Sequence, residues 1–323
     1  MQQRPLGRSG LAVSRLALGT MTWGRDTDPD DAGEQLKFYL EAGGTLIDTA
    51  AAYGAGDAER IIGRLVKHLG NRDEMVIATK AGFVIRSGER IVDTSRRALL
   101  RDLEGSLDRL GTDYVDLWQI HAFGAAPLAE TLDAVDHAVH TGRARYAGVS
   151  NFVGWQTAQA ATWQCAFPGR TPIASAQVEY SLLARRAEVE VLPAVRAFGM
   201  GLFPWSPLGR GVLTGQYRNG TPRGSRAASD HFAWFVEPYL EARSRGVVEA
   251  VVKAADGLDL TPLQVALLWV RDAPGVTAPL LGARTPGQLA PALAVDDQTL
   301  PDEIARALDD VSGGPNLGRD AGD

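Results

Sequence analysis

Four ionisable side chains stand at the ends of three apolar runs or in the turn after one of them. Asp48 ends the first run and Tyr53 lies five residues later, whereas Lys80 and His121 end the second and third runs. Each residue taken singly also fits a buried cap or a loop contact. If the runs are strands of a parallel α/β barrel, however, their C-terminal ends meet on one face. We therefore expect these four side chains to be neighbours in space.

Together these residue types suggest acid–base chemistry. A tyrosine phenol has a pKa near 10, and an adjacent ammonium favours the phenolate and lowers that value. Asp48 would position the Lys80 ammonium, Lys80 would lower the pKa of Tyr53, and Tyr53 would give a proton to a developing alkoxide. His121 would orient a carbonyl or assist proton transfer. Apart from His137 and His140, which are three residues apart and are interpreted as surface residues, the histidines show no metal-ligand spacing. A hydride from a nicotinamide cofactor is therefore the reasonable source of electrons.

The elements that would position these groups alternate between strand and helix. A β-hairpin is expected over residues 3–14. Helices are expected to start and stop at capping residues and glycines, for example Pro29 to Ala42, with Asp57 as a possible N-cap of the next helix. The remaining expected segments are strands at 14–18, 45–48, 75–80, 115–121, 144–150, 173–178, 201–205 and 276–281, and helices at 58–69, 94–110, 128–141, 153–163, 185–198 and from 286.

Eight such units with right-handed crossovers predict a closed (β/α)8 TIM barrel, a single domain over residues 1–323. An open doubly wound sheet that binds a dinucleotide would be expected to carry G-x-G-x-x-G after its first strand. The sequence there is Gly-Thr-Met-Thr-Trp-Gly, which does not match. Residues 206–275 form a long insertion between strands seven and eight, expected as loop over 209–230 and as helices at 239–256 and 261–272. The tail Gly313 to Asp323 is expected to be disordered.

Composition limits the partners. The chain has 323 residues, a net charge of −6 and a pI near 5.5, which argues against a nucleic-acid surface. Its single cysteine, Cys165, allows no intrachain disulfide, and no membrane helix or apolar signal core is evident. We expect a cytoplasmic monomer or weak homo-oligomer acting on a small molecule. Trp23 and Phe83 could form an aromatic substrate mouth, whereas Trp118 is expected in the core.

Seven motifs occur in order and in register with the expected strand ends. They are LIDTAAAYG (46–54), ATK (78–80), QIH (119–121), GVSN (148–151), QVEYS (177–181), PWSPLGRG (204–211) and LLGARTPGQL (280–289). On these motifs the chain resembles the aldo-keto reductases, which are NADPH-dependent carbonyl reductases on a (β/α)8 barrel. It looks closest to the bacterial branch related to the potassium-channel β subunits. The resemblance runs from the hairpin to about Ala294.

The resemblance implies a role for each matching position. Tyr53 would be the proton donor, with Asp48, Lys80 and His121 completing the tetrad. The carboxamide of the nicotinamide would be held by Ser150, Asn151 and Gln177, with Trp205 stacked on the ring. Further cofactor contacts would come from Gly19, Thr20 and Met21 near the reacting centre, from Ser206, Pro207, Leu208, Gly209 and Gly211 along the pyrophosphate, and from Arg226, Gly282, Arg284 and Gln288 at the adenosine end.

The expected cofactor is NADPH rather than NADH, because guanidinium groups recognise phosphate in bidentate fashion and Arg226 and Arg284 could pair with the 2′-phosphate. The chain departs from the family at Pro291 and Ala292, which replace a Glu-Asn pair, and at Gln216, which replaces a lysine. Both changes remove polar contacts at the adenosine end.

The predicted activity is NADPH-dependent reduction of aldehydes or ketones to alcohols. Two alternatives remain. One is an NADPH-binding regulatory subunit with residual reductase activity. The other is a barrel lyase that uses Lys80 as a Schiff-base nucleophile.

Overall fold

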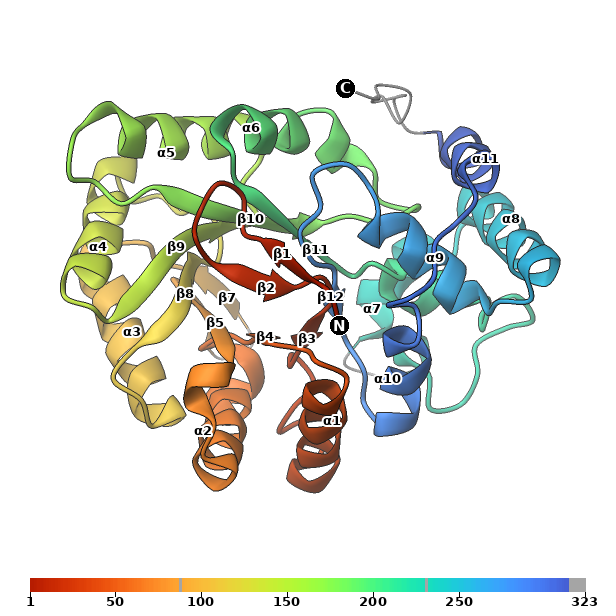
Figure 1. The fold of residues 1–323 in the computed structure, drawn as a ribbon, viewed down its shortest axis with the longest axis horizontal. Helices are drawn as coiled ribbons and strands as arrows, with labels where there is room; N and C mark the ends of the chain where they lie inside the picture. Colours follow the sequence, from red (N-terminus) through yellow and green to blue (C-terminus); the bar gives the residue numbers. More distant parts are fainter. Residues whose placement is uncertain (87–88, 230–231, 314–323) are drawn as a thin grey trace.

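The computed structural model describes residues 1–86, 89–229 and 232–313 and confirms the barrel. Eight parallel strands follow the order β11-β10-β9-β8-β5-β4-β3-β12 (Figure 1). A parallel bridge between Leu202 and Val276, with the Thr277 amide donating to the Leu202 carbonyl at 2.8 Å, links β11 to the segment before β12. The barrel strands are β3 (Ala17–Gly19), β4 (Leu46–Asp48), β5 (Val76–Ala81), β8 (Val115–Ile120), β9 (Ala144–Ser150), β10 (Ile173–Glu179), β11 (Gly201–Trp205) and β12 (Leu280–Leu281).

Strand eight is much shorter than the expected 276–281. Pro279 has no N–H to donate to a ladder. Its carbonyl accepts from Ala17 at 3.0 Å, and regular pairing with β3 begins only at Leu280. The eighth strand therefore consists of β12 and the isolated bridge at Val276.

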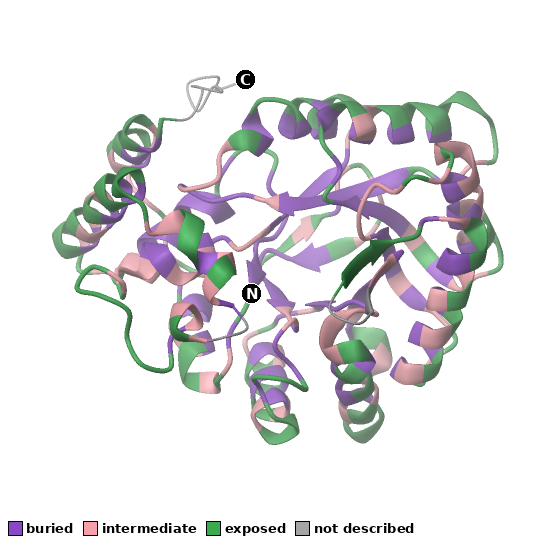
Figure 2. Ribbon diagram, turned by 180° about the vertical axis from the view of Figure 1, so that it is seen from behind, coloured by how far each residue is buried: buried purple, intermediate pink, exposed green. Residues whose placement is uncertain are grey.

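Helices cover the outside of the barrel and bury their apolar faces against it (Figures 1 and 2). The first of them begins as expected, because Asp28 accepts hydrogen bonds from the amides of Asp30 and Asp31. The expectation for the second was wrong: Gly56 is the N-cap, and Asp57 is the first helical residue. The surrounding helices are α1 (Pro29–Glu41), α2 (Asp57–Leu69), α3 (Arg96–Leu110), α4 (Leu128–His140), α5 (Gly154–Ala166), α6 (Val191–Phe198) and α10 (Pro286–Leu293).

Two hairpins lie outside the barrel. The expected one, β1 (Gln3–Pro5) with β2 (Ala12–Ser14), crosses the front of the barrel in Figure 1. A second hairpin was not predicted: β6 (Phe83–Arg86) pairs antiparallel with β7 (Glu89–Val92) directly after β5. It lies at the other end of the barrel, which Figure 2 shows from behind.

The insertion after β11 is more ordered than expected. Residues 209–230, predicted as loop, contain 3₁₀ turns at η4 (Gly209–Thr214) and η5 (Arg226–Ala228). The two expected helices are present as α8 (Ala242–Leu258) and α9 (Pro262–Arg271) and lie to one side of the barrel with α11 (Asp302–Ser312), which was not predicted (Figure 1). The other short elements are η1 (Tyr53–Gly56), η2 (Arg72–Glu74), η3 (Arg186–Glu188), α7 (Ala233–Val236) and η6 (Glu237–Tyr239).

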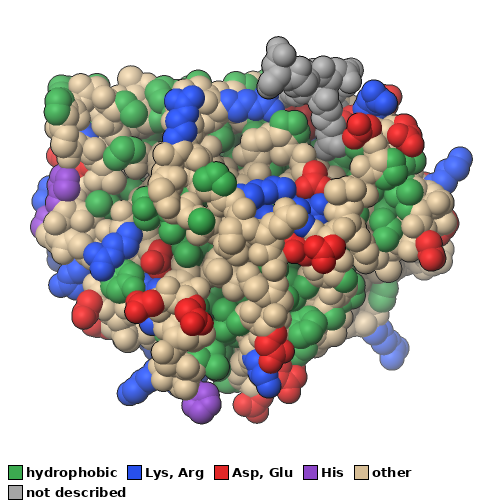
Figure 3. All heavy atoms as spheres, viewed as in Figure 1, with side chains coloured by type: hydrophobic (Ala, Val, Ile, Leu, Met, Phe, Trp, Pro, Cys, Tyr) green, Lys and Arg blue, Asp and Glu red, His purple; other side chains and the backbone are tan. Residues whose placement is uncertain are grey.

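The expected helix 185–198 is interrupted, since η3 and α6 are separate elements. The predicted disorder of the tail falls, beyond Gly313, outside the described residues. Within the part of the chain that the structure describes, no helix is both long and apolar enough to cross a membrane. Acidic and basic side chains are interspersed over the face shown in Figure 3.

Candidate active site

The ends of β4, β5 and β8 bring the predicted tetrad together. Lys80 Nζ donates to Asp48 Oδ2 at 2.7 Å and to the Tyr53 hydroxyl at 3.2 Å. The His121 ring lies edge-on to the Tyr53 ring, with centroids 5.9 Å apart. Tyr53 is presented by the turn η1, which begins immediately after the loop that follows β4. The geometry therefore matches the predicted Asp48–Lys80–Tyr53 chain of contacts.

The Lys80 ammonium has no exposed surface and is held by three acceptors. Besides Asp48 and Tyr53, it donates to the Thr49 carbonyl at 2.8 Å. Burial alone would lower the pKa of Lys80, but the Asp48 carboxylate and Tyr53 together raise it above the ordinary value. Lys80 is therefore a fixed cation at neutral pH.

The pKa of Tyr53 is shifted opposite to our expectation. Burial raises it, and the nearby Asp48 carboxylate acts in the same direction. The Lys80 ammonium opposes this shift without overcoming it. We expected a net lowering because charge counting from sequence omits desolvation, which penalises the phenolate. The Tyr53 phenol is consequently protonated at neutral pH.

His121 is neutral at physiological pH. Burial, and then the repulsion of the Lys80 cation, lower the pKa of its imidazole to about 3. Its Nδ1 atom is buried and has no hydrogen-bond partner among the described residues. A neutral imidazole offers one donor and one acceptor nitrogen. His121 can therefore hydrogen-bond a carbonyl oxygen but does not add a second positive charge.

Asp48 is held on its other side by β10. Gln177 Nε2 donates to Asp48 Oδ1 at 2.8 Å, and Gln119 Nε2 approaches the same atom at 3.5 Å. The Asp48 carbonyl accepts from both the amide and the hydroxyl of Thr20 at 3.0 Å. Gln177, predicted to hold the cofactor, thus hydrogen-bonds the carboxylate of the predicted tetrad.

A second group of predicted residues lies at the ends of β9 and β11. Asn151 has a left-handed backbone, with φ of 58°, and its Nδ2 donates to the His121 carbonyl at 2.9 Å and to Ser150 Oγ at 3.1 Å. The Trp205 indole N–H donates to Asn151 Oδ1 at 3.0 Å. Asn151 thereby holds the half-buried indole, and its side chain links the backbone of His121 to the predicted stacking residue Trp205.

The motif after Trp205 turns sharply. Ser206 and Arg210 have φ of 52° and 59°, and Gly209 and Gly211 have φ of 55° and 93°. A Cβ atom at Gly209 would lie 2.8 Å from the Leu183 side chain. Successive amides in such left-handed turns can form a concave anion site. The amides of Gly209 and Gly211 already donate to the carbonyls of Ser206 at 2.9 Å and Leu208 at 3.0 Å, so a phosphate would have to bind other amides of this turn.

Two arginines lie together at the predicted adenosine end. The Arg284 cation contributes, after burial, to lowering the pKa of Arg226. Arg284 Nη2 donates to the Gly224 carbonyl at 2.7 Å, and its amide donates to Gln288 Oε1 at 3.0 Å. Neither arginine makes an ion pair within the described ranges. Two half-buried cations close together fit a bound phosphate, although the Asp26 carboxylate also acts on Arg226 and partly offsets the lowering of its pKa.

The remaining predicted positions are distributed over the same face of the barrel. Thr20 and Pro207 are buried, and Gly19, Met21 and Leu208 are half-buried. Gly282 is exposed, and a Cβ atom added there would contact nothing within 4 Å. At the positions that depart from the family, Pro291 lies inside α10, Ala292 is buried, and Gln216 Nε2 donates to the Gly211 carbonyl at 3.2 Å.

The predicted aromatic mouth is only partly correct. Trp23 has no exposed surface and its indole N–H points to Gln35 at 3.4 Å, so it belongs to the core. Trp118 is buried as expected. Phe83 does lie at the site, because its ring centroid is 5.2 Å from that of His121.

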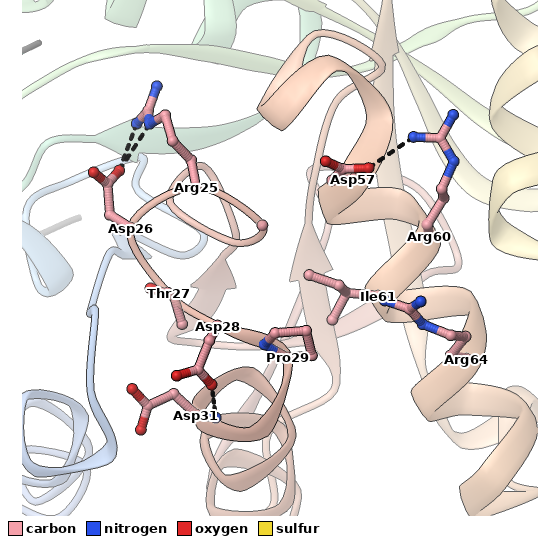
Figure 4. Close-up of a pocket in the computed structure, with 11 residues that line it drawn as sticks. Arg25, Asp26, Thr27, Asp28, Pro29, Asp31, Asp57, Arg60, Ile61 and Arg64 are labelled. Carbon is pink, nitrogen blue, oxygen red and sulfur yellow. Dashed lines mark hydrogen bonds and ion pairs between the residues drawn. The ribbon is translucent and has the colours of Figure 1, made fainter.

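Another cavity of about 520 Å³ lies between the loop before α1 and the helix α2 (Figure 4). Its wall contains two ion pairs: Arg25 with Asp26 at 2.8 Å, and Arg60 with Asp57 at 2.9 Å. None of the tetrad residues lines it. This cavity is separate from the candidate active site.

Sequence reasoning missed several contributors. Thr49 acts through its carbonyl, which no side-chain pattern reveals. The β6–β7 hairpin could have been recognised from VIRSGERIV, in which two β-branched pairs flank a polar segment that contains Ser-Gly. Arg210 stands inside a recognised motif, yet its contacts with Glu179 at 2.8 Å need the tertiary structure. Among the described residues, no cluster could hold a metal ion.

Comparison with known proteins identifies a family and several relatives. The model of the aldo/keto reductase family matches residues 15–312. The chain is 38% identical to "Uncharacterized oxidoreductase YrpG" of Bacillus subtilis (strain 168), over 98% of this chain and 97% of that protein. It is 30% identical to "Aldo-keto reductase YhdN" of the same strain, over 96% and 93%. It is 34% identical to "Probable voltage-gated potassium channel subunit beta" of Oryza sativa subsp. japonica, over 90% and 89%.

Proposed function

The chain belongs to the aldo/keto reductase family of oxidoreductases, and we propose that it reduces aldehydes or ketones with NADPH, using Tyr53 as the proton donor. The observation that carries the proposal is the buried Lys80 ammonium, which touches both Asp48 at 2.7 Å and the Tyr53 hydroxyl at 3.2 Å. This places a protonated phenol beside a permanent cation at the C-terminal face of the barrel, where catalytic groups of this fold lie.

In the proposed reaction, the Tyr53 hydroxyl gives its proton to the carbonyl oxygen. When bound, NADPH would supply the hydride to the carbonyl carbon, and the products would be an alcohol and NADP⁺. The Lys80 ammonium stabilises the tyrosinate that forms, and Asp48 keeps the ammonium in place. Neutral His121 hydrogen-bonds the carbonyl oxygen and orients it. Solvent then returns a proton to Tyr53.

The preference for NADPH rests on the two arginines at the adenosine end. Arg226 and Arg284 lie close enough for the charge of one to lower the pKa of the other, with burial the larger cause. A 2′-phosphate would relieve that repulsion and accept charge-assisted hydrogen bonds. Trp205 and Asn151 would hold the nicotinamide, and the turn from Ser206 to Gly211 would follow the pyrophosphate.

The contacts of Lys80 argue against the lyase alternative. A Schiff-base nucleophile must lose its proton, and the pKa of Lys80 is raised by Asp48 and Tyr53 against the effect of burial. A regulatory role remains the alternative, since two relatives are named as potassium-channel β subunits. That role predicts tight cofactor binding without appreciable turnover.

The test compares wild type with Tyr53→Phe. NADPH oxidation is followed by absorbance with a panel of aldehydes, and cofactor affinity is measured separately by fluorescence titration. We expect wild type to turn over and Tyr53→Phe to lose about 10²- to 10⁴-fold in kcat while binding NADPH equally well. If both proteins bind NADPH and neither reduces any carbonyl, the regulatory role is favoured and the reductase proposal is wrong.

A further inference from the structure

Two chain segments that leave opposite sides of the barrel meet above its C-terminal face. The β6–β7 hairpin follows β5, and α7 lies in the insertion that follows β11. In the strand order, β5 and β11 are four places apart, which is half of the circuit of an eight-stranded barrel. The Arg90 guanidinium nevertheless lies 4.4 Å from the ring centroid of Trp234 in α7. This contact therefore spans the mouth above the tetrad.

The hairpin side of this contact is anchored at its base. Gly82 has φ of 85°, and a Cβ atom there would lie 3.0 Å from the Leu99 side chain. The Gly82 amide donates to Asp102 at 3.3 Å, and its carbonyl accepts from Asp93 at 3.1 Å. Phe83, the next residue, contacts His121. The hairpin thus rises from a fixed point beside the catalytic histidine.

The other side is anchored by Arg210. Its guanidinium makes two hydrogen bonds of 2.8 Å to Glu179 at the end of β10 and lies 3.7 Å from the Phe235 ring centroid. It also donates to the Phe235 carbonyl. Phe235 in turn contacts both Trp234, at 5.5 Å between ring centroids, and Trp205, at 6.3 Å. The position of Trp234 is therefore coupled to the predicted nicotinamide-stacking residue.

We propose that Arg90 and Trp234 form a clasp across the active-site mouth, and that this clasp selects compact carbonyl substrates over bulky ones. The inference rests on the proposed reductase function. Both side chains are exposed, with Trp234 50% accessible. A cation–π contact at an exposed site favours the closed arrangement by only about two- to fivefold. A small aldehyde reacts beneath the closed clasp, whereas a bulky one must displace it.

The first experiment measures discrimination, as the ratio of kcat/KM for propanal to kcat/KM for 4-phenylbenzaldehyde. Arg90→Ala and Trp234→Ala should each lower this ratio by about two- to fivefold. The double variant should lower it no further, because either change removes the whole contact. Arg90→Lys keeps a cation and should therefore lower the ratio less than Arg90→Ala does. An unchanged ratio in both single variants of an active enzyme would overturn the clasp.

The matched control is Arg145→Ala. It removes another exposed cation–π contact, in which the Arg145 guanidinium lies 4.1 Å from the ring centroid of Tyr114. Arg145 is near the N-terminal end of β9 and hence at the opposite end of the barrel from the tetrad. This variant should leave the ratio unchanged. If it lowers the ratio as much as Arg90→Ala does, the effect is not local to the mouth and the proposal fails.

A second readout is independent of activity. Amide hydrogen exchange of residues 89–92 in β7 should become about two- to fivefold faster in Trp234→Ala, although Trp234 lies on the opposite segment. Arg145→Ala should not change it. Unchanged exchange in Trp234→Ala would refute a contact across the mouth. If wild type reduces neither aldehyde, both the proposed function and the substrate selection are refuted. If wild type is active and the ratio is unchanged in Arg90→Ala and Trp234→Ala, only the clasp is refuted.

Discussion

The pH dependence of carbonyl reduction tests the electrostatics of the site most directly. Proton donation needs protonated Tyr53, a form that predominates below its pKa and is lost as pH rises through it. Burial, aided by Asp48, raises that pKa above the ordinary value of 10.0. His121 has a pKa of about 3 and does not titrate near neutrality. We therefore expect kcat/KM for reduction to be level from about pH 6 to pH 9.

The perturbation is Lys80→Met, which removes the ammonium 3.2 Å from the Tyr53 hydroxyl. An opposite charge at such a distance lowers the pKa of an acid by about 1–3 units, and each unit is worth about 1.4 kcal/mol. Without Lys80, only burial and Asp48 act on Tyr53, and both raise its pKa. The variant should lose about 10²-fold or more in kcat/KM, because the phenol becomes a weaker acid and its anion is no longer stabilised.

The assay records initial rates of NADPH oxidation across this pH range for wild type, Lys80→Met and Tyr53→Phe. Lys67→Met is the control, since Lys67 is exposed on α2. It should behave like wild type. A fall in wild-type kcat/KM with a midpoint between about pH 6 and pH 9, absent from Tyr53→Phe, would show that Lys80 outweighs burial. That result would refute our assignment of the pKa direction.

Two further predictions concern binding and stability. Arg284→Ala should raise the dissociation constant of NADPH by about 10- to 100-fold and change that of NADH little, because only NADPH carries the 2′-phosphate; fluorescence titration measures both, and equal losses would contradict the assignment. Glu59 is fully buried and pairs with Arg109 at 2.7 Å, so Arg109→Met should lower the free energy of unfolding by about 3 kcal/mol because it leaves a buried charge unpaired. In thermal unfolding, Arg109→Met should have a lower Tm than the Glu59→Met/Arg109→Met double variant. Additive losses of stability in the double variant would argue against a buried pair.

The tetrad could be predicted from sequence because a parallel barrel converts order along the chain into proximity. A residue that ends a strand must lie at the C-terminal face, whatever its distance in sequence. Asp48 ends β4, Lys80 is the last residue but one of β5, and His121 follows β8, and the structure brings them together. The predicted length of the eighth strand was wrong for a local reason. The apolar run 276–281 is typical of a strand, but Pro279 has no backbone N–H and cannot donate a hydrogen bond to the neighbouring strand.

What sequence could not supply was the balance between opposing effects. The charge of Lys80 and the phenol of Tyr53 are visible in the sequence, but the degree of burial is not, so the pKa direction was wrong. Trp23 was assigned to a substrate mouth from its place after a strand, and only packing shows that it is buried. The contact of Arg90 with Trp234 joins residues far apart in the sequence, on segments with no shared pattern.

Burial also explains why this site can hold two neutral hydrogen-bonding groups beside a fixed ion pair. Taking Lys80 out of water is costly, and Asp48, the Thr49 carbonyl and Tyr53 offset that cost with three hydrogen bonds. The same loss of water keeps the phenol protonated and the imidazole of His121 uncharged. A carbonyl oxygen would thus meet two neutral groups in front of one cation. The resting state is then ready for proton donation without any prior change of protonation.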